Sequence, residues 1–219
     1  MKIVRIDEAL KNKVPGYCLA VMSFEIKVSP STEELKAVMK KLGQEVKSQL
    51  TLETLLKEPR IQAARSGYKA LGKDPSRYRL ATESLLRRLI KGSDLYYVSN
   101  AVDIGNIISV KTQRSVAVLD ENQIQGEVLI RIGKDEPYEG IGRGKINVAN
   151  IPVYCDNIGP FGSPTSDTPR TQIKETTKQI LLFITSFNGT EGLNTDVELA
   201  KDLFERFSDV SNFSLEIVE

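Results

Sequence analysis

Three polar residues recur at intervals of three in an otherwise apolar segment. They are Asn100, Asp103 and Asn106, within YVSNAVDIGNIISV (residues 97–110). Read as a helix, the segment places all three on one flank, because residues three apart are neighbours on a helical surface. The segment lacks the Lys and Glu of a solvated helix face. The three side chains therefore belong in or beside a buried region, where each needs a partner or a ligand.

A purely structural explanation accounts for two of the three residues. Asn100 is a good N-cap, and Asp103 stands where a capping-box acid reaches back to it. Asn106 has no such explanation. Its neighbour Gly105 costs roughly 1 kcal/mol relative to Ala in a helix interior. A glycine at this position suggests that another backbone or a ligand approaches closely.

A second group of chemically useful residues lies in the long loop DNIGPFGSPTSDTPRT (residues 156–171). Its glycines and prolines can make the loop rigid enough to hold Ser166, Asp167 and Arg170 in place. Long loops inside compact domains are often functional. The loop is not a phosphate-binding P-loop, because no Gly-Lys-Ser/Thr follows. The alternative is a stiff connector in which Ser166 and Asp167 cap a short turn.

Three further motifs give weaker signals. GIGRGK (residues 140–145) favours a tight hairpin-like turn, since it lacks the strand-to-helix context of a dinucleotide fold. Cys155 beside Asp156 favours a buried strand thiol over a nucleophile, because nothing nearby activates a thiolate. Four aspartates offer oxygen ligands for a hard metal ion, but their spacing is not specific: Asp103, Asp120, Asp156 and Asp167. We expect no metal and no cofactor.

Composition excludes several kinds of chemistry. The chain has 219 residues and no histidine, which removes Ser-His and Cys-His nucleophiles and the usual zinc sites. No apolar run is long enough to span a bilayer, and the N-terminus does not resemble a signal peptide. The two cysteines are therefore expected to be free thiols, and we expect a cytoplasmic protein.

Charge is unevenly distributed around a net value of +1. Residues 76–114 carry seven basic and three acidic side chains, whereas residues 191–219 carry two basic and eight acidic ones. A basic middle beside an acidic end permits a polyanionic partner without requiring one. Any single arginine can equally belong to a solvated helix face.

The elements that must position these residues change in kind along the chain. Apolar periodicity predicts helices from about residue 32, towards residue 69, over 81–92 and over the 97–110 segment, and later over 195–207. Short apolar runs predict strands over 18–28, 115–120, 127–133, 151–156, 179–187 and 213–219. We therefore predict one α+β domain spanning residues 1–219, with mainly antiparallel sheets and flanking helices.

Taken in order, five sequence blocks resemble the editing domain of the phenylalanyl-tRNA synthetase beta subunit, in particular free-standing versions of that domain. They are YRLATESLLRRLIKG, LYYVSNAVDIGNIISV, SVAVLD, EVLIRIG and IPVYCD with the GPFGSPTSDTPRT loop. The resemblance covers roughly residues 67–189. It implies an α+β fold around a central cleft that accepts an aminoacyl group on a tRNA end and hydrolyses tyrosine wrongly attached to the phenylalanine tRNA.

The resemblance also assigns roles to individual residues. Asn106, Ser166 and Asp167 would be catalytic by positioning the ester or water, while other cleft residues bind substrate: Asn100, Asp103, Asp120, Gly159, Gly162, Thr165 and Arg170. Four arginines would meet RNA phosphates: Arg79, Arg87, Arg88 and Arg114. Two polar groups of the synthetase pattern are missing, because Ala117 replaces a His and Ser163-Pro164 replaces Gly-Glu.

Two functional hypotheses follow. The first is a stand-alone domain that binds a tRNA end or aminoacyl-tRNA and hydrolyses mischarged tRNA in trans, with the tRNA's terminal hydroxyl helping to orient the water. The second is an amino-acid or small-metabolite binding protein or hydrolase that uses the same cleft without tRNA. In that case Asp103 or Asp167 would bind an ammonium group.

Overall fold

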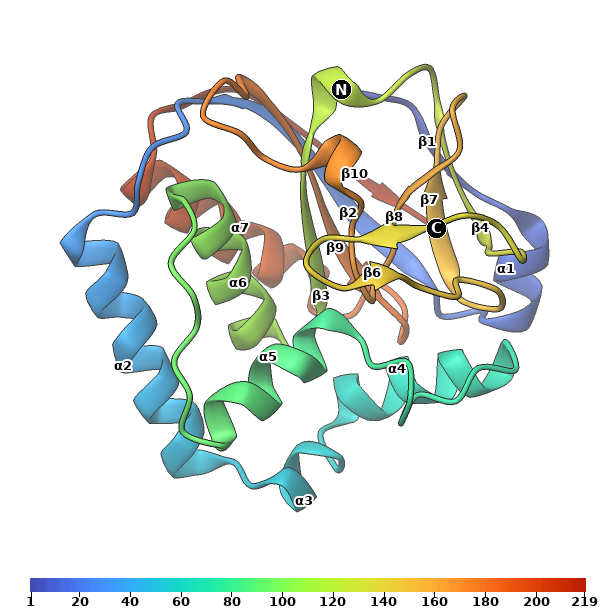
Figure 1. Ribbon diagram of the computed structural model, residues 1–219, viewed down its shortest axis with the longest axis horizontal. Helices are drawn as coiled ribbons and strands as arrows, with labels where there is room; N and C mark the ends of the chain where they lie inside the picture. The colour runs from blue at the N-terminus through green and yellow to red at the C-terminus, as the bar shows by residue number, and fades with distance from the viewer.

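The computed structural model describes every residue from Met1 to Glu219, and it has an α+β architecture (Figure 1). Its helices are α1 (Glu8–Lys13), α2 (Glu33–Gln49), α3 (Leu52–Leu55), α4 (Pro59–Ala70), α5 (Ala81–Ile90), α6 (Asn100–Thr112) and α7 (Leu193–Phe207), with short 3-10 helices η1 (Glu121–Gln123) and η2 (Pro169–Thr171). None of the helices is both long enough and apolar enough to cross a bilayer.

The central layer is a four-stranded antiparallel sheet. Its strand order is β10 (Val210–Val218), β2 (Cys18–Ile26), β9 (Gln179–Ser186) and β3 (Ser115–Asp120). Both faces of β2 and β9 are covered, which explains why their sequences read as continuous apolar runs instead of alternating ones. β10 and β3 are the two edges of this sheet.

A second sheet packs beside the first. Its order is β1 (Val4–Ile6), β4 (Val128–Ile132), β7 (Pro152–Cys155) and β8 (Pro160–Gly162), with only the β1–β4 pair parallel. The hairpin of β5 (Glu139–Gly140) and β6 (Gly144–Lys145) confirms the tight turn predicted for GIGRGK. Left-handed backbone at Gly142 and Gly144 explains the need for glycine there.

Two hydrophobic cores lie on opposite faces of the central sheet. On one face, side chains from α2, α5, α6 and α7 pack against alternate sheet residues such as Met22 and Leu182. On the other face, the second sheet and α4 pack against the intervening residues, such as Val21 and Phe183. The order of layers is therefore helices, central sheet and second sheet, as the alternating side-chain directions of the strands require.

The predicted α+β fold with mainly antiparallel sheets is confirmed, as are most of the predicted elements. Five elements were not predicted from the sequence: β1, α1, β8, η1 and η2, of which β8 and η2 lie inside the predicted 156–171 loop. They are short, and short elements carry little periodicity. The N-cap of α6 is Ser99, whose Oγ accepts a bond from the Val102 amide at 3.4 Å, so the prediction of Asn100 as the cap was wrong by one residue.

The edge strand β10 is irregular. Its pairing with β2 shifts register between Ser211 and Ser214, and Asn212 within the shift has a left-handed φ of 55°. The strand is largely exposed on its outer side, where Leu215 is one of the exposed large apolar residues. The shift is a β-bulge, which bends a strand and increases its local twist.

Candidate functional site

Asn100, at the start of α6, uses its hydrogen-bonding capacity inside the protein. Its Oδ1 accepts a bond from the Ser29 amide at 3.0 Å. Its Nδ2 donates to the carbonyl of Lys27 at 3.0 Å and to Ser208 Oγ at 2.9 Å. The buried side chain therefore joins the segment after β2 to the end of α7. The polar atoms of Asn100, which was predicted to bind substrate, therefore already have protein partners.

Asp103 is likewise part of the framework. Its Oδ1 accepts from the Val98 amide at 3.0 Å, and its Oδ2 accepts from Ser31 Oγ at 2.5 Å. Burial raises the pKa of this carboxyl, although these hydrogen bonds counteract the effect. Asp103 thus ties the segment before α6 to the segment before α2, and both of its oxygens, predicted to contact substrate, have protein partners.

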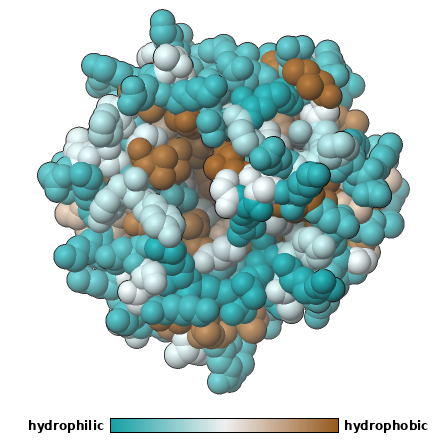
Figure 2. Space-filling view, viewed as in Figure 1, coloured by the Kyte–Doolittle hydropathy of each residue, from teal (hydrophilic) through white to brown (hydrophobic).

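Gly105 marks a close approach, as its position in the helix suggested. A Cβ there would overlap Val118 of β3, so the neighbour is a strand side chain and not a ligand. Asn106 beside it is half-buried, and its side chain makes no hydrogen bond within the protein. Figure 2 shows a hollow near the centre of the viewed face, in the region where Figure 1 places β3 beside α6. Of the three polar residues on α6, Asn106 alone remains available to a ligand.

The ends of the 156–171 loop are tied together by an ion pair. Arg170 donates from Nη1 and Nη2 to the two carboxylate oxygens of Asp156, each at 2.9 Å. Burial alone would raise the pKa of Asp156, but Arg170 and the amides that bind the carboxylate hold it below its ordinary value. Arg170 therefore closes the loop and does not present free charge to a substrate.

The middle of the loop is held by hydroxyl groups. Ser163 Oγ donates to the carbonyl of Ser166 at 2.8 Å and accepts from the amides of Thr165 and Ser166. Tyr138 also donates to the carbonyl of Ser166, and Tyr68 pairs with Thr165 Oγ1 at 2.8 Å. The predicted rigidity thus comes mainly from these bonds. Thr165, predicted to bind substrate, already has a protein partner.

Asp167 is the exception within this network. Its Oδ1 is fully buried and has no hydrogen-bond partner. The oxygen lies close to the backbone of Gly162, where an added Cβ would come within 2.8 Å of it, which explains the requirement for glycine there. Burial raises the pKa of Asp167 to about 7, although a hydrogen bond from the backbone of Ser163 to the carboxyl counteracts part of the effect. A buried oxygen without a partner is costly, and such groups are concentrated at functional sites.

A pocket of about 960 Å³ opens beside this loop. Its wall includes Tyr138, Thr168 and Arg170, and its rim carries both charges: Asp135, Glu136, Glu139 and Lys145. Thr168 Oγ1 is buried and has no partner, like Asp167 Oδ1 in the preceding residue. Two adjacent residues therefore each have an unsatisfied polar atom, and the second of them, Thr168, lines the pocket.

The central sheet divides the predicted site. Through Gly105, α6 packs on the face of β3 that carries Val116 and Val118. The loop packs on the opposite face, where Ser115 Oγ donates to the carbonyl of Pro164 at 2.9 Å and where Ala117 is buried. The structure therefore brings Ser166, Asp167 and Thr168 together, and it places Asn100, Asp103 and Asn106 on the other side of β3.

Asp120 ends β3, as predicted, but its oxygens bind within the protein. Oδ1 accepts from the Asn122 amide at 3.1 Å and Oδ2 from Thr177 Oγ1 at 2.8 Å, so it caps η1. Gly159 has a φ of 143°, a conformation that favours glycine, and its carbonyl accepts from the Asp156 amide. Both residues, predicted to bind substrate, shape the backbone.

The four arginines predicted to bind RNA differ in exposure. Arg79 is exposed and unpaired, and Arg88 is half-buried. Arg87 binds the fully buried Glu83, with Nε and Oε1 2.7 Å apart. Arg114 is buried and donates to Asp196, Ser186, Asn188 and the carbonyl of Glu191. Arg114 is therefore part of the core, which corrects its predicted contact with phosphate.

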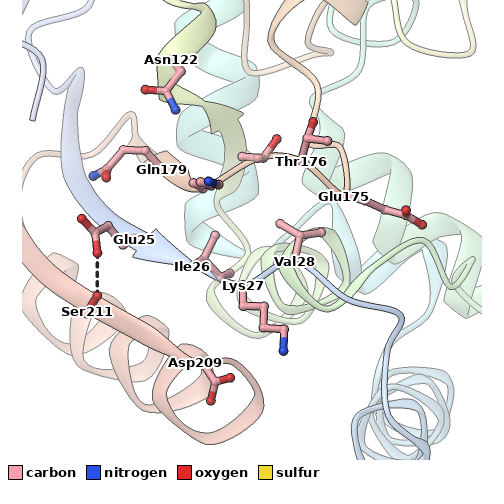
Figure 3. Close-up of a pocket in the computed structure, with 12 residues that line it drawn as sticks. Glu25, Ile26, Lys27, Val28, Asn122, Glu175, Thr176, Gln179, Asp209 and Ser211 are labelled. Carbon is pink, nitrogen blue, oxygen red and sulfur yellow. Dashed lines mark hydrogen bonds between the residues drawn. The ribbon is translucent and has the colours of Figure 1, made fainter.

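A separate pocket of about 610 Å³ lies between the end of β2, the start of β10 and residues 175–179 (Figure 3). Charged side chains of both signs line it, among them Glu25, Lys27 and Asp209. Ser211 Oγ donates to Glu25 Oε2 at 2.9 Å across one side. The wall contains none of the predicted site residues and no unsatisfied buried side chain.

Cysteine and metal chemistry have little structural basis here. Cys155 is buried in β7, and burial raises the pKa of its thiol to about 11, which confirms the interpretation as an unactivated strand thiol. No three His, Cys, Asp or Glu side chains come together in an arrangement that could hold a metal ion.

Sequence reasoning missed Tyr138 and Thr168. Tyr138 lies in the KDEPYEG segment, which has no apolar periodicity that would predict a buried or functional position. Thr168 lies inside the predicted loop and was passed over because a threonine beside prolines is also typical of a turn. Both contribute to the pocket only because the β5–β6 hairpin folds over the loop, with the Ile141 amide bonded to the carbonyl of Asp167 at 2.9 Å.

Comparisons with known proteins give a family and similar solved structures. The model of the B3/4 domain family matches residues 63–215. No curated protein matches the sequence. The chain is similar to the crystal structure of an N-terminal fragment of the phenylalanyl-tRNA synthetase beta subunit from Pyrococcus horikoshii, with 12% identity and a TM-score of 0.43. That match covers 96% of this chain and 54% of the other, so this chain spans about half of its length.

Proposed function

Because the chain belongs to the B3/4 domain family, a phenylalanyl-tRNA synthetase beta-like type of domain, we propose that it binds the 3′ end of an aminoacyl-tRNA and hydrolyses the ester of a wrongly attached amino acid. The reaction adds water across the ester: a bond forms between the carbonyl carbon and the water oxygen, and the bond to the ribose oxygen breaks. The products are the free amino acid and the tRNA with its terminal hydroxyl restored.

The observation that carries this proposal is the unpartnered carboxylate oxygen of Asp167. Asp167 does not itself line the 960 Å³ pocket, but the next residue, Thr168, does, and so does Tyr138. A group with a pKa of about 7 suits general acid–base catalysis near neutral pH. In a chain without histidine, such a carboxyl can accept a proton from the attacking water and return it to the departing ribose oxygen.

Other groups support binding of the ester in this pocket. Thr168 Oγ1 has no protein partner, and Ser166 Oγ makes only a long contact of 3.4 Å with the carbonyl of Asp167. Either hydroxyl can donate to the ester or orient the water. The volume lies at the upper end of the roughly 300–1,000 Å³ range typical of small-ligand pockets, which suits an aminoacyl group joined to a ribose.

RNA phosphates would be met by basic residues outside the pocket whose donors are free. Arg79 is exposed and unpaired, and the terminal nitrogens of Arg88 have no acceptor in the protein. Each phosphate neutralised in this way releases counterions, so binding must weaken as salt increases. Neutralising both arginines is therefore expected to weaken tRNA binding and to reduce its salt dependence.

The decisive experiment follows ester loss from phenylalanine tRNA charged with tyrosine, beside the same tRNA charged with phenylalanine. We expect selective loss of the tyrosyl ester, abolished by Asp167→Asn. The matched control is Asp202→Asn on α7, an exposed position, which should retain full activity. Activity retained in Asp167→Asn would remove the carboxylate from the mechanism.

Asn106→Ala distinguishes the two sides of β3. If the ester binds in the loop pocket, this variant keeps its activity, because Asn106 lies on the helical side of the strand. Loss of activity in Asn106→Ala but not in Asp167→Asn would instead place the ester at the hollow beside α6. A protein that is stabilised by free amino acids and binds no tRNA would favour the small-molecule hypothesis.

A further inference from the structure

The segment between α5 and α6 exposes an unusual run of side chains. Residues 91–99 form no helix or strand, and Tyr96, Tyr97 and Val98 are 70%, 48% and 63% exposed. They are the only three consecutive large apolar residues that the surface exposes. Figure 1 shows the segment in green, running between α2 and the pair α5 and α6. The loop pocket has no residue in common with it.

Each tyrosine ring has a cation over it. The Arg88 guanidinium lies 4.0 Å from the ring centre of Tyr96, and Lys36 Nζ lies 5.7 Å from that of Tyr97. Arg88 donates from Nε to the carbonyl of Asp94 at 2.6 Å, and its two terminal nitrogens have no acceptor in the protein. The guanidinium is therefore oriented by the protein while its outer donors remain free, an arrangement suited to a phosphate.

Internal contacts hold the exposed residues in position. Leu95 is buried in the helical core, immediately before Tyr96. The Val98 amide, immediately after Tyr97, donates to Asp103 Oδ1. Asp103 is held in turn by Ser31. Because the segment is fixed at both ends of the tyrosine pair, a partner loses little affinity in ordering it.

The surrounding charge favours a polyanion. Lys91 is in the same segment, and the Lys47 ammonium lies beside Gly92. Of the nearby acids, Glu33 pairs with Lys36, and Asp94 accepts from Arg88 through its backbone carbonyl, which leaves its carboxylate without a basic partner. The cations Arg88, Lys91 and Lys47 outnumber that one carboxylate. An apolar protein partner would have to desolvate these cations, whereas a nucleic acid would pair with them.

We propose that Tyr96 and Tyr97 form a stacking site for unpaired RNA nucleotides, with Arg88 and Lys36 contacting the adjacent phosphates. Every base has a flat π face, so two exposed rings flanked by cations bind single strands with little sequence preference. The inference rests on the proposed function in its choice of RNA, but it adds a contact distant in sequence from the loop. Unpaired nucleotides are accessible to such rings, whereas paired ones are not.

The test is fluorescence anisotropy with a short, unstructured, labelled RNA that carries no aminoacyl group. Aromatic stacking is lost on substitution by alanine, so we expect the Tyr96→Ala/Tyr97→Ala variant to bind about tenfold or more weakly. The Tyr96→Phe/Tyr97→Phe variant keeps the rings and should bind like the parent. Leu129→Ala, an exposed apolar position on the second sheet, is the control and should also bind like the parent.

Three outcomes would overturn the inference: no RNA binding by the parent, unchanged binding by the double alanine variant, or equal loss in the phenylalanine variant. Thermal melts of each variant verify that it is folded. The proposed hydrolysis is tested separately, because Asp167→Asn should bind this RNA normally. RNA binding that depends on the two tyrosines, without any ester hydrolysis, would support this stacking site and contradict the proposed reaction.

Discussion

Arg170 and Asp156 face each other across the base of the loop that carries Ser166 and Asp167, joined by two hydrogen bonds of 2.9 Å. Arg170 Nη1 also donates to the carbonyl of Gln123 at 2.8 Å, which links the loop to η1. The Asp156 side chain accepts in addition from the amides of Ile158 and Gly159. One ion pair thus fixes both the closure of the loop and the turn within it.

We expect Arg170→Lys to loosen this loop. A lysine ammonium cannot reproduce the planar two-pronged contact, so the variant should be less stable by roughly 1–2 kcal/mol. The amides of Ile158 and Gly159 should exchange hydrogen faster, which NMR or mass spectrometry can follow. Arg206→Lys is the matched control, because the Arg206–Glu34 pair is exposed and contributes little. Unchanged exchange at both amides would contradict the assigned role.

Asp167→Asn should change how stability depends on pH. Between the ordinary pKa of about 4 and the folded value of about 7, the folded state keeps a proton that the unfolded chain has lost. Stability from this group therefore falls as pH rises through that window. An asparagine cannot ionise, so the variant lacks this pH-dependent loss. The stability of the variant minus that of the parent should therefore be larger at pH 8 than at pH 5, as measured by denaturant midpoints. Asp202→Asn should show no such difference.

Gly105→Ala tests the contact between α6 and β3. The new methyl group would overlap Val118, so we expect a loss of roughly 1–3 kcal/mol despite the better helix propensity of alanine. Combining it with Val118→Ala should recover part of that loss, because the second substitution removes the Val118 methyl group that the added methyl group would overlap. Thermal unfolding of the two single variants and the double variant measures the coupling. If the stability losses of the two single variants simply add up in the double variant, the two residues are not in contact.

The arginines should separate into structural and surface groups. Arg114→Ala leaves buried partners such as Asp196 poorly paired, and we expect a loss of roughly 3–5 kcal/mol. Arg79→Ala removes an exposed side chain and should leave stability unchanged. If RNA binds as proposed, Arg79→Ala should also reduce the affinity for tRNA and the slope of the salt dependence of binding. Calorimetry and binding isotherms at several salt concentrations measure the two effects.

Sequence periodicity predicted the fold class because the main helices and strands of this chain have strong local patterns. The α6 segment and the strands 115–120 and 179–187 are examples, since their apolar residues are close together in sequence. The short elements β1 and β8 depend on distant partners, which a local pattern does not contain. Val4, for example, pairs with Val128.

The site was harder to predict for the same reason. The polar spacing of Asn100, Asp103 and Asn106 correctly indicated buried groups in need of partners, but the first two find those partners in Ser29 and Ser31, far away in sequence. The loop was identified from its glycines and prolines alone. Only the folded chain shows that Asp167 Oδ1 lacks a partner, because hydrogen bonds are satisfied in three dimensions.

The bulge in β10 bears on how copies of this protein behave at high concentration. A straight, exposed edge strand offers unpaired amides and carbonyls to the same strand of another molecule, which is a route to aggregation. Here the register shift between Ser211 and Ser214, with left-handed Asn212 inside it, interrupts that row of donors and acceptors. The irregularity that weakens the sheet locally therefore protects the folded chain against edge-to-edge self-association.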